Sequence, residues 1–218
     1  MKEIKFDQIF MLLKKESKKW KNPFVTELES LEKNPFNTLI SCLLSLRTKD
    51  NVTAKASLRL LRRYNTPEKI IKLTNKKIEE LIYPVGFYKT KAKRIKEICE
   101  VLIKNYNSKV PESFDELIKL KGVGRKTANI VMVYGYKKQG LPIDIHCHRI
   151  PNRLGWVKTK TPEETEKELI KILPKKYWHD FNSLFVQFGQ NICVPVSPFC
   201  SRCPINKYCL MIVVIRSR

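Results

Sequence analysis

Apolar positions recur every three or four residues along almost the whole chain, and this spacing predicts helices. Near the N-terminus, Phe6, Ile9, Phe10 and Leu13 form one such stripe. Further segments with helical periodicity cover residues 36–46, 50–64, 75–82, 90–106, 113–120, 125–136, 145–154, 162–173 and 176–190. The regular alternation of apolar and polar residues that marks a half-buried strand is absent. The sequence therefore predicts an all-α protein.

Three of the predicted helices begin with a strong start signal. Asn34, Thr66 and Thr161 each precede a proline, so a capping side chain is followed by the residue best suited to the first helical position. Glu164 lies three residues after Thr161 and completes the pattern of a capping box. Residues 137–142 are polar or glycine-bearing, which marks a candidate crossing between two subdomains.

Composition indicates a globular protein with a polyanionic partner. The chain has 218 residues, of which 43% are hydrophobic, enough for a core in one or two domains. Its formal net charge is +22 and its basic residues are spread along the chain, which favours nucleic acid or an anionic surface as partner. No apolar run approaches the roughly 18 to 20 residues of a membrane span, and the N-terminus lacks a signal-peptide core. We therefore expect a cytoplasmic protein, or a nuclear one in a eukaryote.

The segment LKGVGRKTA combines a possible phosphate grip with an amine nucleophile. Gly122 and Gly124 allow a tight turn between helices, so that main-chain N–H groups and a helix N-terminus can face a phosphate. Lys126 follows in the first helical turn and could attack a sugar carbon if Asp144, eighteen residues later, takes its proton. The same residues could also form a plain turn with a solvated lysine. Nucleotide-binding loops do not match, because a third glycine is missing and Arg125 replaces the glycine that a P-loop needs before Lys-Thr.

Four of the seven cysteines lie close together near the C-terminus. Cys193, Cys200, Cys203 and Cys209 have the spacing C-x6-C-x2-C-x5-C, which in a reducing compartment indicates a metal site and not disulfides. The short and uneven gaps favour an iron-sulfur cluster over zinc, whose structural sites more often show two C-x2-C knuckles. The other three are expected to be small buried side chains: Cys42, Cys99 and Cys147.

The hairpin segment, the segment IDIHCHRIPNRLG and the cysteine spacing occur in this order, and together they resemble the endonuclease III family of helix-hairpin-helix (HhH-GPD) DNA glycosylases. The similarity runs from about residue 30 to Cys209. It implies a six-helix barrel domain with a helix-hairpin-helix over residues 28–138 and a four-helix iron-sulfur cluster domain from residues 1–27 and 139–218, with a cleft between them. It also implies a 4Fe-4S cluster on the four cysteines and a monomeric protein.

The resemblance implies a bifunctional enzyme of base excision repair that acts on double-stranded DNA containing damaged bases or abasic sites. Lys126 would attack C1′ of a flipped-out nucleotide, an oxidised pyrimidine would leave as an imine forms, and β-elimination would cut the strand 3′ to the lesion. Asp144 could accept the lysine proton or stabilise positive charge on the sugar. Two alternatives stay open: a glycosylase for mismatched uracil or thymine or for an oxidised purine, and a non-catalytic, redox-sensitive DNA-binding protein.

The family pattern also suggests which residues contact DNA. The hairpin contributes Lys121, Gly122, Val123, Gly124 and Arg125. Arg47 stands where the family usually has a glutamine that fills the gap left by the extruded base, and Phe87 stands where relatives usually carry an aliphatic wedge. Supporting roles are expected for Ser45 and Asp50 in the base pocket and for His146 beside Asp144. Asp50 could equally cap a helix and His146 could equally pack in the core.

Overall fold

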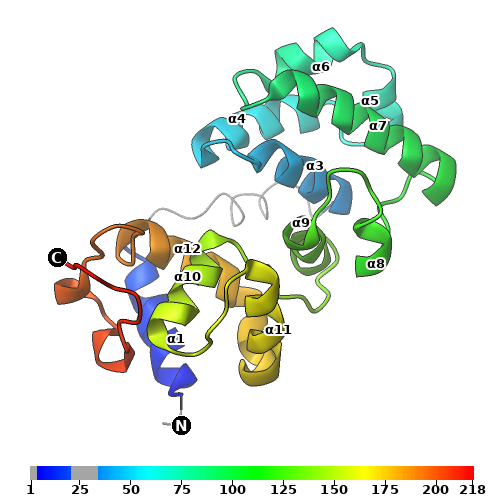
Figure 1. Cartoon of the computed structure of the whole chain (residues 1–218). Helices are drawn as coiled ribbons and strands as arrows, with labels where there is room; N and C mark the ends of the chain where they lie inside the picture. Colours follow the sequence, from blue (N-terminus) through cyan, green and yellow to red (C-terminus); the bar gives the residue numbers. More distant parts are fainter. Residues whose placement is uncertain (1–3, 21–33) are drawn as a thin grey trace. The chain divides into compact units, whose positions relative to one another are not determined.

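The computed structural model describes residues 4–20 and 34–218 (Figure 1). Helices and turns account for the secondary structure of these residues, and no strand occurs among them, so the predicted all-α class is confirmed. The described residues fall into two compact units, one of residues 34–140 and one of residues 4–20 together with 141–218. The domain boundary expected between residues 27 and 28 lies outside the described residues. No helix in the described part is long and apolar enough to cross a membrane.

The unit of residues 34–140 is built around a helix that is buried on nearly all sides. Its elements are α3 (Pro35–Ser45), α4 (Asp50–Leu61), α5 (Pro67–Ile71), α6 (Asn75–Ile82), α7 (Tyr88–Tyr106), α8 (Phe114–Leu117), α9 (Arg125–Ile130) and the π-helical turn η1 (Val131–Gly135). Helix α3 packs against α4, α7, α9 and η1, and α7 packs against α5 and α6. Every residue of α3 from Phe36 to Leu44 is buried, including the polar Asn37, Thr38 and Ser41.

The predicted helix starts are confirmed. Asn34, Thr66 and Thr161 each accept a hydrogen bond from a main-chain N–H two or three residues later, at 2.9, 3.4 and 3.2 Å. The capping box at Thr161 closes differently from the standard pattern, because the carboxylate of Glu164 accepts from the N–H of Lys160 at 2.8 Å. One orphan N–H group before the helix is thereby satisfied.

Several predicted helices end earlier than their apolar periodicity suggests. The segment 125–136 changes from α-helix to π-helix after Ile130, the segment 50–64 stops being helical at Leu61, and only Phe114–Leu117 of the segment 113–120 is α-helical. Within η1, a Cβ on Gly135 would lie 3.1 Å from the main chain of Pro35, so this turn packs tightly on the start of α3. Periodicity over five residues cannot distinguish an α-helix from a π-helical turn.

The second unit is organised around α12. Its elements are α1 (Phe6–Ser17), α10 (Ile145–Leu154), α11 (Pro162–Ile172), the 3-10 turn η2 (Lys175–Tyr177), α12 (Trp178–Asn191) and the 3-10 turns η3 (Cys200–Arg202) and η4 (Asn206–Tyr208). Helix α12 packs against α1 and α10, and α10 packs against α11. In the apolar stripe predicted near the N-terminus, Ile9, Phe10 and Leu13 are buried and Phe6 is half-buried. The ring of Phe10 stacks on Tyr177 with 4.0 Å between ring centroids. The segment that follows α12 consists of loops and short 3-10 turns. The four clustered cysteines lie in this segment.

Candidate functional site

The two glycines of the hairpin have different reasons to be glycine. Gly122 has φ +87°, a left-handed conformation that side chains with a Cβ rarely adopt. Gly124 has φ −95° and ψ 176°, which any residue can adopt, and a Cβ built on it would meet no atom within 4 Å. Both glycines are exposed. Gly122 is therefore needed for the turn itself, whereas nothing within its own unit requires a glycine at position 124.

Lys126 lies directly after this hairpin, in the first turn of α9, as the sequence predicted. The lysine is half-buried, and it is close enough to Cys42 of α3 for its positive charge to influence that thiol. Burial raises the pKa of Cys42 to about 12, and the charge of Lys126 opposes this shift. Cys42 is therefore an inert, protonated neighbour of the proposed nucleophile at neutral pH.

The remaining hairpin residues are held by neighbouring side chains. The guanidinium group of Arg125 lies over the ring of Phe114, 4.7 Å from its centroid. Lys121 is exposed, and its amine lies 3.8 Å from the carboxylate of Glu97. The side chain of Val123 is buried and its N–H donates to a carbonyl within the turn at 2.9 Å. Val123 therefore stabilises the hairpin, and the side chains of Lys121 and Arg125 provide its positive charge.

Arg47 and Phe87 lie on two loops of the same unit. Both have left-handed backbone conformations, with φ 52° and φ 58°, and the guanidinium carbon of Arg47 lies 5.7 Å from the centroid of the Phe87 ring. Phe87 is 62% exposed. Ser45 ends α3 and donates to the carbonyl of Cys42 at 2.8 Å, while Asp50 is exposed and is the first residue of α4. The two loops thus present an arginine and an aromatic ring side by side to solvent.

Asp144 belongs to the other unit and is the N-cap of α10. One of its carboxylate oxygens accepts hydrogen bonds from the N–H groups of His146 and Cys147, both at 2.9 Å. The carboxylate is half-buried, and these two bonds fix its orientation. The ring of His146 lies against α12, where a Cβ on Gly189 would come within 2.3 Å of its Nδ1. His146 therefore packs between α10 and α12.

A chain of contacts leads from this helix start to the cysteine segment. The guanidinium group of Arg149 lies 3.1 Å from Nδ1 of His146 and donates to the carbonyl of Cys193 at 2.7 Å. Arg153, one turn further along α10, donates to the Sγ of Cys193 at 3.4 Å and to the carbonyl of Val194 at 2.7 Å. The two arginines share a face of α10 because they are four residues apart.

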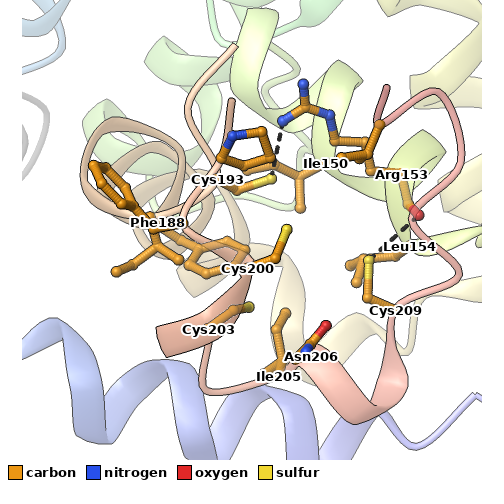
Figure 2. Close-up of a pocket in the computed structure, with 14 residues that line it drawn as sticks. Ile150, Arg153, Leu154, Phe188, Cys193, Cys200, Cys203, Ile205, Asn206 and Cys209 are labelled. Carbon is orange, nitrogen blue, oxygen red and sulfur yellow. Dashed lines mark hydrogen bonds between the residues drawn. The ribbon is translucent and has the colours of Figure 1, made fainter. Parts of the chain in front are cut away.

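The four clustered cysteines surround one pocket, with their sulfur atoms around a common space (Figure 2). Besides the cysteines, the pocket is lined by Ile150, Arg153, Leu154, Phe188, Ile192, Pro198, Phe199, Ile205, Asn206 and Val214. None of the seven cysteines forms a disulfide, and the three expected to be buried, Cys42, Cys99 and Cys147, are buried. The pocket wall is mostly apolar, so charge inside it is poorly screened.

The pocket is unfavourable for thiolates unless a cation accompanies them. The pKa of Cys203 is raised to about 12, mainly by burial, and negative charge on the other three cysteines contributes to this rise. Burial also raises the pKa of Cys209. Metal binding requires deprotonated thiols, so a positively charged centre would have to displace their protons. The donor set of four thiolates fits zinc or an iron-sulfur cluster.

Comparisons with known proteins identify the family. The model of the HhH-GPD superfamily of base excision DNA repair proteins matches residues 40–175. Endonuclease III of Thermotoga maritima is 49% identical over 178 residues, which make up 82% of this chain and 84% of that protein. The chain belongs to the endonuclease III family. It spans between 47% and 63% of the length of the plant and vertebrate members that it matches.

Solved structures of endonuclease III bound to DNA share the fold. A non-covalent endonuclease III–DNA complex superimposes with a TM-score of 0.80 at 34% identity, over 94% of this chain and 95% of that one. A trapped endonuclease III–DNA covalent intermediate gives 0.77 at 34% identity, over 86% and 92% of the two chains. These likenesses support DNA binding.

As an endonuclease III family member, the chain is a DNA glycosylase and AP lyase that removes oxidised pyrimidines. The activity expected from the sequence is thereby confirmed over its two alternatives, a glycosylase for mismatched bases or oxidised purines and a non-catalytic DNA-binding protein.

Sequence reasoning missed three basic residues that hold the loops of this endonuclease III fold. Lys91 and Arg153 are buried, and Arg149 is half-buried. Each donates to main-chain carbonyls of a loop that carries a candidate site residue. A signal was present for Lys91, because it continues the apolar stripe formed by Ile95, Ile98 and Leu102 on α7. A lysine on the buried face of an amphipathic helix must find acceptors there.

Proposed function

We propose that Lys126 is the nucleophile and Asp144 its acid-base or electrostatic partner in the glycosylase and lyase reactions. The observation that carries this proposal is the position of Lys126, half-buried and directly after an exposed glycine hairpin. A trapped covalent intermediate exists for endonuclease III with DNA, which supports a nucleophile of this kind. The fixed carboxylate of Asp144 is suited to accept a proton or to face a developing positive charge.

The reaction proceeds in two stages. The amine of Lys126 attacks C1′ of the flipped-out nucleotide, the glycosidic bond breaks, and the oxidised pyrimidine leaves with a proton. The sugar ring opens to an imine between the lysine and C1′. Removal of a proton from C2′ then expels the 3′ phosphate by β-elimination, and water finally hydrolyses the imine to release the lysine. Every step after base release involves the lysine, and none needs a second nucleophile from the protein, because water attacks the imine.

The hairpin of residues 121–125 would grip the DNA backbone near the lesion. Gly124 is exposed and has open space where a side chain would stand, so a phosphate can approach its main chain closely. Lys121 and Arg125 supply positive charge on either side. Val123 supports the turn from within the core. These contacts hold the backbone without reading the sequence of the bases.

Arg47 and Phe87 would enter the duplex at the position vacated by the flipped nucleotide. An arginine can fill the gap and donate to the opposite base, and an exposed phenylalanine can stack on a neighbouring base pair. Ser45 and Asp50, at the two ends of the Arg47 loop, are the proposed lining of the base pocket on this side. His146 supports the helix start that carries Asp144.

We assign a 4Fe-4S cluster to the four cysteines. The four cysteines line one pocket. The short and uneven gaps between them favour a cube over a structural zinc site, which more often shows two C-x2-C knuckles. Bound there, the cluster would cross-link the segment, its positively charged core would offset the charge of the thiolates, and Arg153 would donate a hydrogen bond to the Cys193 thiolate.

We further propose that residues 28–138 form the six-helix barrel domain and that residues 1–27 and 139–218 form the cluster domain. The expected cleft between them stays a prediction. The substrate would be double-stranded DNA with damaged bases or abasic sites, and the enzyme would act as a monomer in the cytoplasm, or in the nucleus of a eukaryote. The net charge of +22 supports a polyanionic substrate.

Borohydride trapping tests the nucleophile. Lys126→Gln removes the amine but only one of 43 basic side chains, so the variant should bind a thymine glycol duplex nearly as well as wild type and form no covalent adduct under borohydride. Lys121→Gln is the matched control, because it removes an exposed hairpin lysine and leaves the nucleophile. An adduct formed equally by wild type and Lys126→Gln would overturn the assignment.

A further inference from the structure

Lys91 is a buried lysine that reaches from α7 into the loop after α3. Its amine donates to the carbonyl of Leu44 at 2.7 Å, to the carbonyl of Leu46, and to the hydroxyl of Thr48 at 3.1 Å. The side chain is 9% exposed. One ammonium group therefore holds three points of the five-residue stretch that contains Arg47.

A structural lysine in this place is costly, which makes its presence informative. Burial lowers the pKa of Lys91 to about 8, and all three acceptors are uncharged oxygens. Removing a charged amine from water without an opposite charge is unfavourable, and hydrogen bonds compensate only in part. An apolar side chain would fill the same site in the stripe of α7 without this cost. Compared with an apolar residue, the lysine adds hydrogen bonds that hold the loop in place.

The same bonds join this loop to the loop before α7. The hydroxyl of Thr48, one of the acceptors of Lys91, also accepts from the N–H of Gly86 at 3.1 Å. A Cβ on Gly86 would lie 2.6 Å from the carbonyl oxygen of Arg47, so the main chains of the two loops touch. Arg59 of α4 donates to the carbonyl of Leu81 at 2.9 Å and to that of Tyr83, which holds the start of the loop before α7 against α4. The two loops form one connected structure.

Each loop contains a residue with a strained backbone. Arg47 and Phe87 both have φ values above +50°, a region that side chains with a Cβ visit rarely. Such conformations persist only where the surrounding contacts determine them. Lys91 and Thr48 make the contacts that do so here, and the result is an arginine lying over an exposed aromatic ring.

We propose that Lys91 is a positioning residue that, through Thr48, locks the loops of Arg47 and Phe87 into one preformed surface for opening the base pair. The proposal rests on the proposed entry of Arg47 and Phe87 into the duplex. Lys91 itself touches neither DNA nor the reacting atoms. Lys91 keeps Arg47 and Phe87 in fixed positions before DNA binds. The two loops therefore do not have to become ordered when the base is extruded.

The test uses Lys91→Met, which keeps the length and apolar stem of the side chain and removes the donors, with Lys93→Met as control on the exposed face of the same helix. The substrates are a thymine glycol paired with adenine in a duplex, where the base pair has to be opened, and the same strand alone, which needs no base pair to be opened. Under single turnover, Lys91→Met should lower the duplex rate by about tenfold to a hundredfold, the range expected when a contacting group shifts by about 1 Å. Cleavage of the single strand should stay within about twofold of wild type, as both rates should in Lys93→Met.

Hydrogen exchange separates the positioning role from the function of the loops. In Lys91→Met, the amide of Gly86 should exchange faster, because its acceptor Thr48 is no longer held. Unchanged exchange would overturn the proposal, and so would an equal loss of rate on both substrates, which indicates a general structural defect. Should Lys91→Met fail to fold, Thr48→Val decides through the ratio of duplex to single-strand rates, since it removes the bridging hydroxyl and leaves Lys91 in place; an unchanged ratio would overturn the proposal.

Arg47→Ala and Phe87→Ala in the same assay distinguish the positioning role of Lys91 from the proposed insertion of Arg47 and Phe87 into the duplex. If both variants lower the ratio of duplex to single-strand rates and Lys91→Met does not, the positioning role of Lys91 is wrong. If neither variant lowers the ratio, the proposed insertion is wrong, and the exchange of Gly86 alone then shows whether Lys91 holds the loops. A lowered ratio in all three variants with faster exchange in Lys91→Met supports the proposal.

Discussion

Gly124→Ala should leave the protein as stable as wild type and yet weaken its binding to DNA. The backbone of Gly124 is in an extended conformation open to any residue, and the added methyl group would meet nothing within 4 Å. Alanine loses less entropy than glycine on folding, by about 0.4 to 1 kcal/mol, but it is a poorer N-cap by up to about 1 kcal/mol, so the two effects nearly cancel. The free energy of unfolding should therefore change by no more than about 0.5 kcal/mol.

Gly122→Ala is the matched comparison two residues away. At φ +87°, an alanine pays roughly 1 to 2 kcal/mol for the left-handed backbone. The methyl group would lie 3.4 Å from the side chain of Arg94, an ordinary contact, so the backbone supplies most of the cost. For a protein of this length, the melting temperature should fall by about 2 to 8 °C.

DNA binding should reverse the order of the two variants. If a phosphate oxygen approaches the main chain at Gly124, a methyl group there displaces it and weakens a hydrogen bond to a charged group, which is worth about 1.5 to 3 kcal/mol. The Kd for a duplex with a non-cleavable abasic analogue should rise by about tenfold or more in Gly124→Ala. Fluorescence anisotropy at fixed salt measures the Kd, and thermal unfolding measures the stability.

Two results would refute this reasoning. A loss of stability in Gly124→Ala as large as in Gly122→Ala would show that the fold itself requires glycine at position 124. A stable Gly124→Ala protein with wild-type affinity would show that the DNA backbone does not approach the hairpin there.

Two further predictions concern the residue that departs from the family pattern and the cysteine pocket. If Arg47 reads the opposite base, its donors favour guanine, so Arg47→Gln should reduce the ratio of single-turnover rates opposite guanine and adenine by about fivefold to a hundredfold; an unchanged ratio would exclude this role. Purified without oxygen, the protein should absorb broadly near 400 nm and contain ~4 iron atoms per chain. One zinc and no iron would overturn the cluster. Cys193→Ala should lose iron and unfold at lower temperature, because metal binding contributes to the folding of this segment.

The helical class and most helix starts could be predicted from the sequence because they depend on local interactions. The cap at Asn34 and the stripe around Phe10 each involve residues within one or two turns, so spacing alone identifies them. Helix ends were predicted less well. The π-helical turn of Val131–Gly135 depends on close packing against Pro35, nearly a hundred residues earlier, which no local pattern records.

The candidate site likewise combines features that local sequence predicts with contacts that depend on long-range packing. Lys126 could be placed after a tight turn because glycine spacing and the following helix are local features, and the cysteine spacing alone indicated a metal centre. The sequence also indicated that Arg47 and Phe87 matter, but not that one lies over the other. That contact depends on two loops forty residues apart.

Only the tertiary structure decided how these loops are held. Lys91 continues the apolar stripe of α7 in the sequence, but the carbonyl groups that it reaches follow from the packing of α7 against α3. Arg153 likewise reaches the cysteine segment only because α10 packs against α12, which leads into that segment. The sequence by itself determined the local elements and the chemical groups of the site. Long-range packing determined which buried charges hold them, because a buried cation must find its acceptors in whatever chain segment lies beside it.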